Sequence, residues 1–200
     1  MRALGALLTA ALLAAGCGES QQARGPGIVG ESPDQVPATE PAPPPTGLPG
    51  ASCRNVNEGN PANFPEFVGV DVDSDAGVDR ITFRFKPASD APQDPPWHFV
   101  SFVEELVTEG EARPVNVEGE AFLLVSFQAI GVDLSSEEPV EVYTGPKRLT
   151  PAFGTLEEAV HLGDFEGQVT WGLGLSDRAC FVLDAAPDHL TLEFPSSSAA

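Results

Sequence analysis

Apolar and polar residues alternate most regularly between Gln168 and Leu175. A period of two is typical of a strand with one buried face. The face expected in the core consists of Val169, Trp171, Leu173 and Leu175, and the opposite face of Gln168, Thr170, Gly172 and Gly174. The two glycines leave bare backbone, which another chain, a sheet or a ligand can approach closely. Residues 163–167 are the expected turn before this strand.

Similar patterns extend through the domain expected at residues 52–194, with turn residues between them. Residues 121–130 form an apolar run that fits a central strand buried on both faces. Helical turns near residues 134–137 or 156–159 stay open as alternatives. The pattern predicts an all-β fold, a β-sandwich or open barrel of about 8 strands. Further strands are expected at 80–86, 97–107, 180–183 and 190–194.

The first 17 residues have the features of a secretion signal. Arg2 precedes an apolar run that is shorter than the ~20 residues needed to span a bilayer. The run ends in Leu13-Ala14-Ala15-Gly16-Cys17, which resembles the lipobox of bacterial lipoproteins. This predicts cleavage before Cys17, acylation of its sulfur, and a lipid-anchored protein on the extracytoplasmic face of the cell membrane. The alternative is an ordinary secreted protein in which Cys17 is incidental.

Residues 18–51 are rich in proline, glycine and polar residues and poor in large apolar side chains. Such a segment buries too little surface to offset its ordering entropy, so we expect a disordered tether. At ~3.1 Å per residue it reaches at most on the order of 100 Å. That reach would lift the following domain from the membrane into a surrounding wall layer. Residues 195–200 are expected to be a disordered tail.

Two cysteines remain, Cys53 before the first expected strand and Cys180 near the last. Exported proteins meet an oxidising setting, so a disulfide between them is predicted. Two buried free thiols are the alternative. In the chain-entropy model, closing so long a loop would stabilise the fold by roughly 4–5 kcal/mol.

The formal net charge of −20 excludes one class of partner. Nucleic acid would repel a chain that has only two lysines and no basic run, so we expect no nucleic-acid binding. Contact with the lipid bilayer is expected only through the acyl chains of Cys17. Acidity alone identifies no partner, because it also serves solubility.

No cluster of residues predicts catalysis, a cofactor or a metal. His98, His161 and His189 lack metal-ligand spacing and are interpreted as ordinary strand residues. The acidic segment Asp71–Asp79 resembles a calcium loop, but its glycine comes one place late and no suitable Glu follows, so an acidic turn is the preferred interpretation. The chain also lacks the Gly-x-Ser-x-Gly motif of a nucleophile elbow.

Adjacent glutamates occur at Glu104-Glu105, Glu137-Glu138 and Glu157-Glu158. Neighbouring residues on a strand point to opposite faces, so these pairs are badly placed to act as acid and base. We interpret them as solvated positions. The protein is therefore not expected to be an enzyme.

Three motifs carry a family resemblance. They are Gly77-Val78-Asp79-Arg80-Ile81-Thr82-Phe83, Tyr143-Thr144-Gly145-Pro146, and Gly163-Asp164-Phe165-Glu166-Gly167 followed by Trp171-Gly172-Leu173-Gly174-Leu175. In this order they resemble the AMIN-like domain of bacterial, mainly actinobacterial, secreted proteins and lipoproteins, over most of residues 66–194. The resemblance implies similarity to AMIN domains, β-sandwich modules that target cell-wall enzymes to peptidoglycan. It implies no enzymatic activity.

Aromatic rings, acids and amides are the groups with which wall-glycan modules commonly bind sugars. The candidate ligand-binding residues are Trp97, Tyr143, Asp164, Glu166, Gly172 and Gly174. Trp97 and Tyr143 are expected to be exposed, whereas Trp171 is expected in the core. The leading hypothesis is a membrane-anchored, non-catalytic module that binds peptidoglycan. The alternative is a protein-interaction lipoprotein of an envelope secretion or wall-synthesis complex, and we rank a small-ligand receptor or an enzyme below both.

Overall fold

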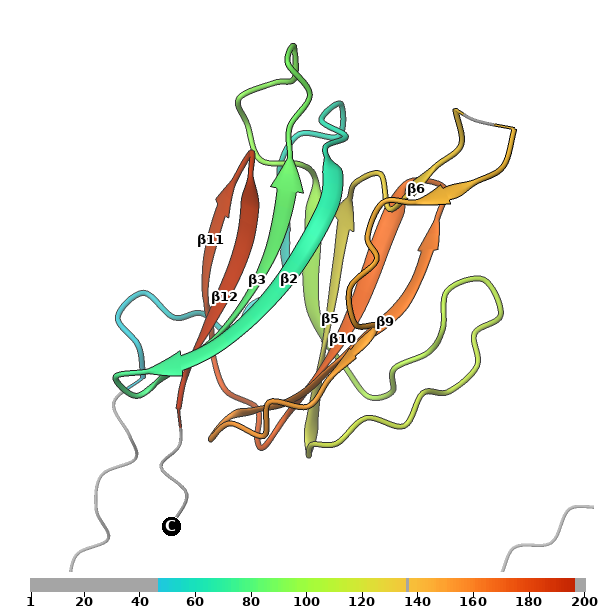
Figure 1. Ribbon diagram of the computed structural model, residues 1–200. Coiled ribbons are helices and arrows are strands. Elements are labelled where there is room, and N and C mark those ends of the chain that lie inside the picture. Colours follow the sequence, from blue (N-terminus) through green and yellow to red (C-terminus); the bar gives the residue numbers. More distant parts are fainter. Residues whose placement is uncertain (1–46, 136, 197–200) are drawn as a thin grey trace, which may run out of the picture. The chain divides into compact units, whose positions relative to one another are not determined.

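A computed structural model describes residues 47–135 and 137–196, which form twelve strands and no helix (Figure 1). The larger sheet has the order β1 (Val56–Glu58), β4 (His98–Val103), β5 (Ala121–Gln128), β10 (Gln168–Leu175), β9 (Leu156–Phe165) and β8 (Arg148–Leu149). The smaller sheet has the order β11 (Val182–Ala186), β12 (His189–Pro195), β3 (Val78–Lys86) and β2 (Glu66–Asp75). A short pair joins β6 (Val132–Asp133) and β7 (Val140–Glu141).

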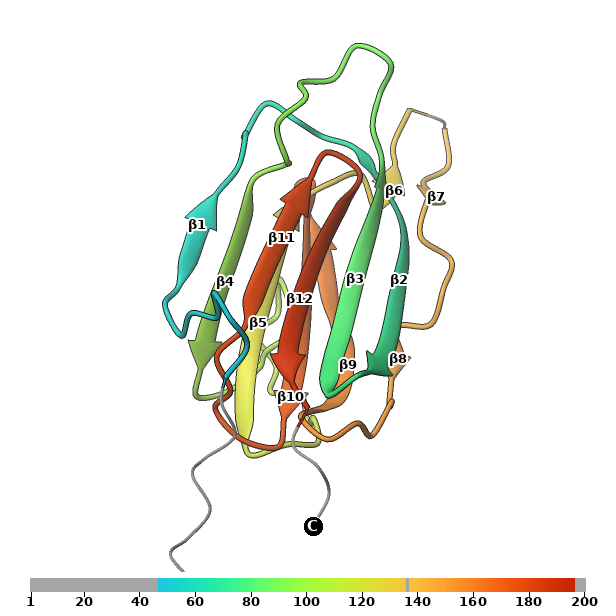
Figure 2. The ribbon, with the colours of Figure 1, turned by 90° about the vertical axis from the view of Figure 1, so that its left-hand side faces the viewer.

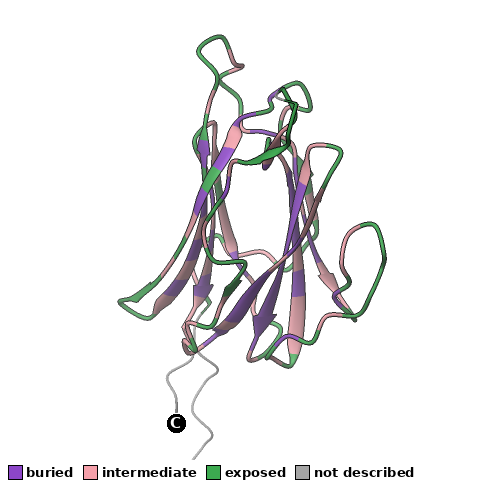
Figure 3. Ribbon diagram, turned by 45° about the vertical axis from the view of Figure 1, so that its right-hand side comes forward, coloured by how far each residue is buried: buried purple, intermediate pink, exposed green. Residues whose placement is uncertain are grey.

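The two main sheets face each other as the layers of a sandwich (Figures 1 and 2). Every named strand pair is antiparallel. The buried residues lie mainly along the facing strands (Figure 3). The predicted all-β fold is confirmed in its sandwich form, and the sheets do not close into a barrel. Four of the strands have only two or three residues, which the alternation pattern does not detect.

Two similar hairpins mark the family motifs. Ala76 and Gly77 connect β2 to β3 with φ angles of 51° and 78°, and Glu166 and Gly167 connect β9 to β10 with 52° and 77°. Two-residue hairpin turns of this type need a positive φ at both central positions, and glycine adopts it without steric cost. The expected turn at residues 163–167 is therefore shorter than predicted, because residues 163–165 belong to β9 and only Glu166 and Gly167 form the turn.

Large aromatic side chains form the centre of the core. Trp171 and Phe83 are fully buried, and their ring centroids are 5.8 Å apart. Phe127 lies 5.1 Å from Phe83, and Phe67 lies 6.3 Å from Trp171. Tilted contacts at these distances suit aromatic pairs and contribute beyond the area that they bury. The predicted inward face of β10 is confirmed, because all four of its members are fully buried.

The opposite face of β10 is also buried, which corrects the expectation of a bare surface. A side chain added at Gly172 would come within 2.6 Å of Leu106, and one at Gly174 would collide with the carbonyl oxygen of Glu118. The connection between β4 and β5 therefore crosses this face, and its apolar residues form a second small core with β9. The glycines permit close approach as predicted, but the approaching chain is the protein's own.

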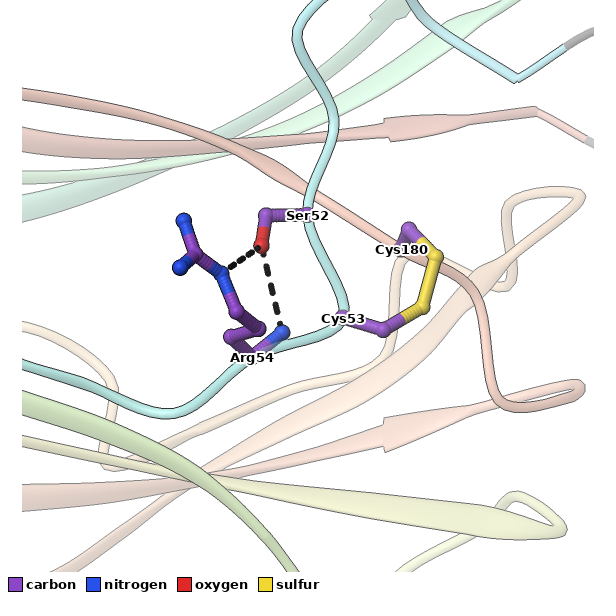
Figure 4. The surroundings of a disulfide bond; sticks show 4 residues. All are labelled: Ser52, Cys53, Arg54 and Cys180. Carbon is purple, nitrogen blue, oxygen red and sulfur yellow. Dashed lines mark hydrogen bonds between the residues drawn. A yellow bond between two sulfur atoms is a disulfide. The ribbon is translucent and has the colours of Figure 1, made fainter.

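A disulfide joins Cys53 and Cys180, whose Cα atoms are 4.4 Å apart across 127 positions of sequence (Figure 4). Beside it, Ser52 and Phe181 exchange backbone hydrogen bonds of 2.8 and 3.2 Å. The segment before β1 is thus attached to the segment before β11 both covalently and by backbone hydrogen bonds. The predicted disulfide is present, and the alternative of two free thiols does not apply.

Asp79 connects the two sheets near the β2–β3 hairpin. Its side chain is fully buried and accepts hydrogen bonds from the backbone N–H groups of Thr155, at 2.7 Å, and Leu156, at 3.1 Å. Ser74 donates a third, at 2.7 Å. Burial alone would raise the pKa of Asp79, but these hydrogen bonds favour the charged form and hold it below its ordinary value of 3.8.

The structure settles some of the remaining sequence predictions. Residues 156–159 begin β9 and do not form a helical turn. The three histidines lie in separate strands, as interpreted. Within the described residues, no helical segment has the length and apolar character needed to cross a bilayer. The signal peptide, Cys17 and nearly all of the tether lie outside the described residues, as does most of the expected tail.

Candidate functional site

A pocket of about 340 Å³ lies where β2 and β9 border the segment from Gly131 to Lys147. The segment is fixed at both ends by backbone hydrogen bonds. Ile130 pairs with the start of β2 through bonds of 2.8 and 3.0 Å, and the carbonyl of Lys147 accepts a 2.8 Å bond from His161. The pocket is lined by Phe67, Gly131, Val132, Glu141, Tyr143, Lys147, His161, Leu162, Gly163 and Asp164.

Tyr143 forms the aromatic wall of the pocket. Its ring lies 4.6 Å from Phe67 and 6.0 Å from Trp171, and its hydroxyl donates a 2.7 Å hydrogen bond to the carbonyl of Pro146. A side chain added at Gly145 would come within 2.6 Å of this ring, so the glycine of the motif makes room for the tyrosine. Burial, with the nearby charge of Asp71, raises the pKa of Tyr143 above 10.0, so its hydroxyl stays protonated at neutral pH.

Asp164 supplies a carboxyl group to the pocket lining. Its Oδ2 atom is buried and has no hydrogen-bond partner among the described residues. A side chain at Gly131 would collide with this oxygen, so glycine is required there for the carboxyl to reach its position. Burial raises the pKa of Asp164 above 3.8, and the backbone N–H of Gly131 only partly opposes the rise. The carboxylate is therefore held at an energetic cost in a place that suits a hydrogen-bond donor.

His161 lies between the core and the pocket. Its ring centroid is 5.4 Å from that of Trp171. Burial and the positive charge of Lys147 lower the pKa of His161 below 6.5, although Glu141 and the backbone of Gly163 act in the opposite direction. The imidazole is consequently neutral at pH 7. It offers the pocket a polar edge without a charge.

Glu141 and Lys147 form an exposed ion pair at the rim, with 2.6 Å between Oε1 and Nζ. Hydrogen bonding from Lys147 lowers the pKa of Glu141, so the carboxylate stays ionised. Because the two charges cancel, Asp164 leaves the lining with a net negative charge. No group of three metal-ligating side chains occurs in the part of the chain that the structure describes. The arrangement is suited to binding through hydrogen bonds and charge.

The structure brings two of the six predicted ligand-binding residues together and separates the others. Tyr143 and Asp164 line the same pocket, although Tyr143 is only 5 % exposed, so its expected exposure was wrong. Glu166 is exposed at the hairpin turn, outside the pocket lining. Trp97 is half-buried and donates a 2.8 Å hydrogen bond to Asn57. Gly172 and Gly174 are covered, as described above, and are not available to a ligand.

The interpretation of the Glu157-Glu158 pair as solvated positions is wrong for Glu158. Glu158 is buried, with only 2 % of its surface exposed, and does not lie on a solvated face. It pairs with Arg148 and accepts a 2.6 Å hydrogen bond from the backbone N–H of Glu118. Arg148 also donates to the carbonyl of Asn116. The ion pair therefore fastens the β4–β5 connection to β9, and its role is structural.

Glu141, Lys147, His161 and Gly131 are pocket residues that the sequence interpretation missed. The segment from Gly131 to Lys147 lacks strand periodicity, so the alternation of apolar and polar residues does not show where its side chains lie. The available signal was the order of the family motifs, because Tyr143-Thr144-Gly145-Pro146 and Gly163-Asp164 both contribute to this pocket. A charged residue next to either motif was the natural further candidate.

Comparison with known proteins gives one family. The family model described as the AMIN-like domain matches residues 65–193. No curated protein and no solved structure matches the chain. The matched range contains nearly all of both main sheets and the whole pocket.

Proposed function

The chain belongs to the AMIN-like domain family, and from this premise we propose that it is a lipid-anchored module that binds peptidoglycan through the pocket beside β9. Membership indicates a non-enzymatic, cell-wall-related module in an extracytoplasmic, envelope-associated protein. The proposal that this pocket binds peptidoglycan rests on one observation. Two motifs that resemble the family's, Tyr143-Thr144-Gly145-Pro146 and Gly163-Asp164-Phe165-Glu166-Gly167, contribute Tyr143, Gly163 and Asp164 to the lining of a single polar cavity.

The chemistry of the pocket supports binding. Apolar side chains, a neutral imidazole and a carboxyl group line one concave site. None of these groups is placed as an activated nucleophile. The proposed non-catalytic role agrees with the general character of the family.

Cosedimentation of the full chain with purified peptidoglycan tests the proposal. We expect retention at moderate salt, and weaker retention after the double substitution Glu141→Ala with Lys147→Ala, which removes the rim ion pair without changing the net charge. The matched control is Glu111→Ala with Arg113→Ala, which removes a similar exposed ion pair in the β4–β5 connection. Absence of retention, together with crosslinks to one envelope protein in cells, would favour the protein-interaction alternative instead.

Lipid anchoring is tested separately. Acylation of Cys17 predicts a mature protein that partitions with membranes and carries a mass increment on its first residue. Cys17→Ser should release the protein from the membrane fraction. A Cys17→Ser protein that stays in the membrane fraction to the same extent would contradict the anchor and leave the wall-binding proposal standing.

A further inference from the structure

We propose that the pocket recognises a primary ammonium group and that Asp164 is the residue that receives it. The inference rests on the proposed function, because it names the part of the wall polymer that the pocket binds. In chemical terms the ligand is the free side-chain amine of a diamino acid in a peptide stem. The glycan strand itself would lie outside the pocket.

The first argument is the state of the Asp164 carboxylate. Among the described residues, no basic side chain lies within ion-pair distance of it, and its buried oxygen has no hydrogen-bond partner. The backbone N–H of Gly131 is the donor that acts on this carboxylate, and no cationic donor accompanies it. A charge-assisted hydrogen bond from an N⁺–H group is among the strongest that a carboxylate can accept. A ligand ammonium supplies the missing positive charge at the carboxyl group that lines the pocket.

The second argument is the charge around the carboxylate. Lys147 is neutralised by Glu141, and His161 is uncharged at pH 7. Asp71 is close enough to Tyr143 for its charge to raise the pKa of that hydroxyl. The surroundings therefore repel a carboxylate or a phosphate. A neutral sugar hydroxyl would leave the negative charge of Asp164 without a counterion.

The third argument is size. About 340 Å³ lies near the lower end of the range of about 300–1,000 Å³ for ligand pockets. Such a volume suits one side chain or one terminal group better than a run of sugar rings. Val132 is a half-buried apolar residue of the lining, and the methylene groups of an amine-bearing side chain can pack against it.

The experiment follows backbone amide shifts of the ¹⁵N-labelled full chain, carrying Cys17→Ser to prevent acylation, during titration at pH 7. The two probes are Nα-acetyl-lysine methylamide and the same compound acetylated also at Nε, both at millimolar concentration. We expect saturable shifts at Gly131, Gly163 and Asp164 with the first probe, and affinity lower by about tenfold or more with the second.

Two variants locate the effect. Asp164→Asn should weaken binding of the first probe by about tenfold or more, because it removes the charge of the acceptor. Gly131→Ala keeps the charge and should weaken binding too, because its methyl group displaces the carboxyl. The control Asp177→Asn makes the same chemical change at an exposed site outside the pocket lining and should leave the affinity unchanged.

Equal affinity for both probes, or no saturable shift with either, would overturn the ammonium assignment. Failure of this inference is distinguishable from failure of the proposed function by comparing untreated peptidoglycan with peptidoglycan whose free amines have been acetylated. Retention on both polymers would leave wall binding standing and reject the ammonium. Retention on neither would reject wall binding, while the probe titration decides the ammonium assignment independently.

Discussion

The two lateral sides of the sandwich are closed in different ways. On one side, the segment before β1 is joined to the segment before β11 by the Cys53–Cys180 disulfide and by backbone hydrogen bonds of Ser52. On the other side, a segment with little regular structure lies beside β2 and β9 (Figure 2). Between them is a pocket of about 340 Å³.

The difference separates stability from recognition. The first side is held by a covalent bond, whereas the second keeps a carboxylate oxygen buried without a partner among the residues that the structure describes. Unsatisfied polar groups are costly and gather at functional sites, where the rest of the fold maintains them. The bonded side is therefore the one that contributes stability, whereas the pocket side carries an energetic cost.

Removal of the disulfide should have the largest effect. The double substitution Cys53→Ser with Cys180→Ser is expected to lower the free energy of unfolding by about 4 kcal/mol, because the unfolded chain regains the entropy of a long loop. Urea denaturation measures the change. The amide shifts of Gly163 and Asp164 in the folded protein should stay as they are, since the pocket is on the other side. Large shifts at those amides would show that the pocket side depends on the disulfide for its structure.

The second largest effect is expected from substitution of Asp79. Asp79→Ala should lower the free energy of unfolding at pH 7 by about 3 kcal/mol, because it leaves the buried N–H groups of Thr155 and Leu156 without their acceptor. The native pKa is depressed, so this contribution is present above the ordinary value of 3.8 and disappears as the pH falls through the native pKa. Urea denaturation at pH 7 and pH 2.5 measures both statements. Equal losses at the two pH values would contradict this account.

The same chemical group has the opposite effect in the pocket. The native pKa of Asp164 is raised, so the folded protein holds its proton more tightly and loses stability as the pH rises from 3.8 through the native pKa. Asp164→Asn should therefore stabilise the protein at pH 7 by about 1 kcal/mol and have no such effect at pH 3. Thermal unfolding at both values, with Asp177→Asn as the control, measures the difference. Destabilisation at pH 7 would show that the carboxylate is satisfied.

The smallest effect concerns His189 on the β11–β12 hairpin. Partial burial lowers its pKa, but hydrogen bonds to Asp188, at 2.8 Å, and Asp184, at 3.3 Å, outweigh this and raise it above 6.5. The stabilisation that protonated His189 gains from these two aspartates is fully present below pH 6.5 and is lost as the pH rises through the native pKa. His189→Gln should cost a few tenths of a kcal/mol at pH 5.5 and nothing at pH 8.5. A cost that is constant across this range would point to packing alone.

The regular part of the fold could be predicted from the sequence because it depends on period and on local turn chemistry. The alternation from Gln168 to Leu175 identifies β10 and its core face, and the glycines at the ends of the family motifs identify two hairpins. The pairing of Cys53 with Cys180 followed from their places near the two ends of the strand region.

The site depends on what lies opposite each residue, and a single sequence does not contain that information. Gly172 and Gly174 show that something approaches closely, but the covering residues come from the β4–β5 connection. Glu158 is buried because Arg148 and the backbone of Glu118 satisfy it. The pocket needs the contact of two separate motifs, and periodicity describes each strand without its neighbours.

The disulfide also determines how the protein would carry a mechanical load. Residues 53–180 form one covalently closed loop, so a pull applied between the two ends of the chain passes directly through the sulfur atoms. Such a pull can unravel β11 and β12, but it cannot lengthen the strands inside the loop. For a module anchored through its N-terminus and bound to the wall at the pocket, the force would instead enter the loop at Cys53 and be shared between its two arms.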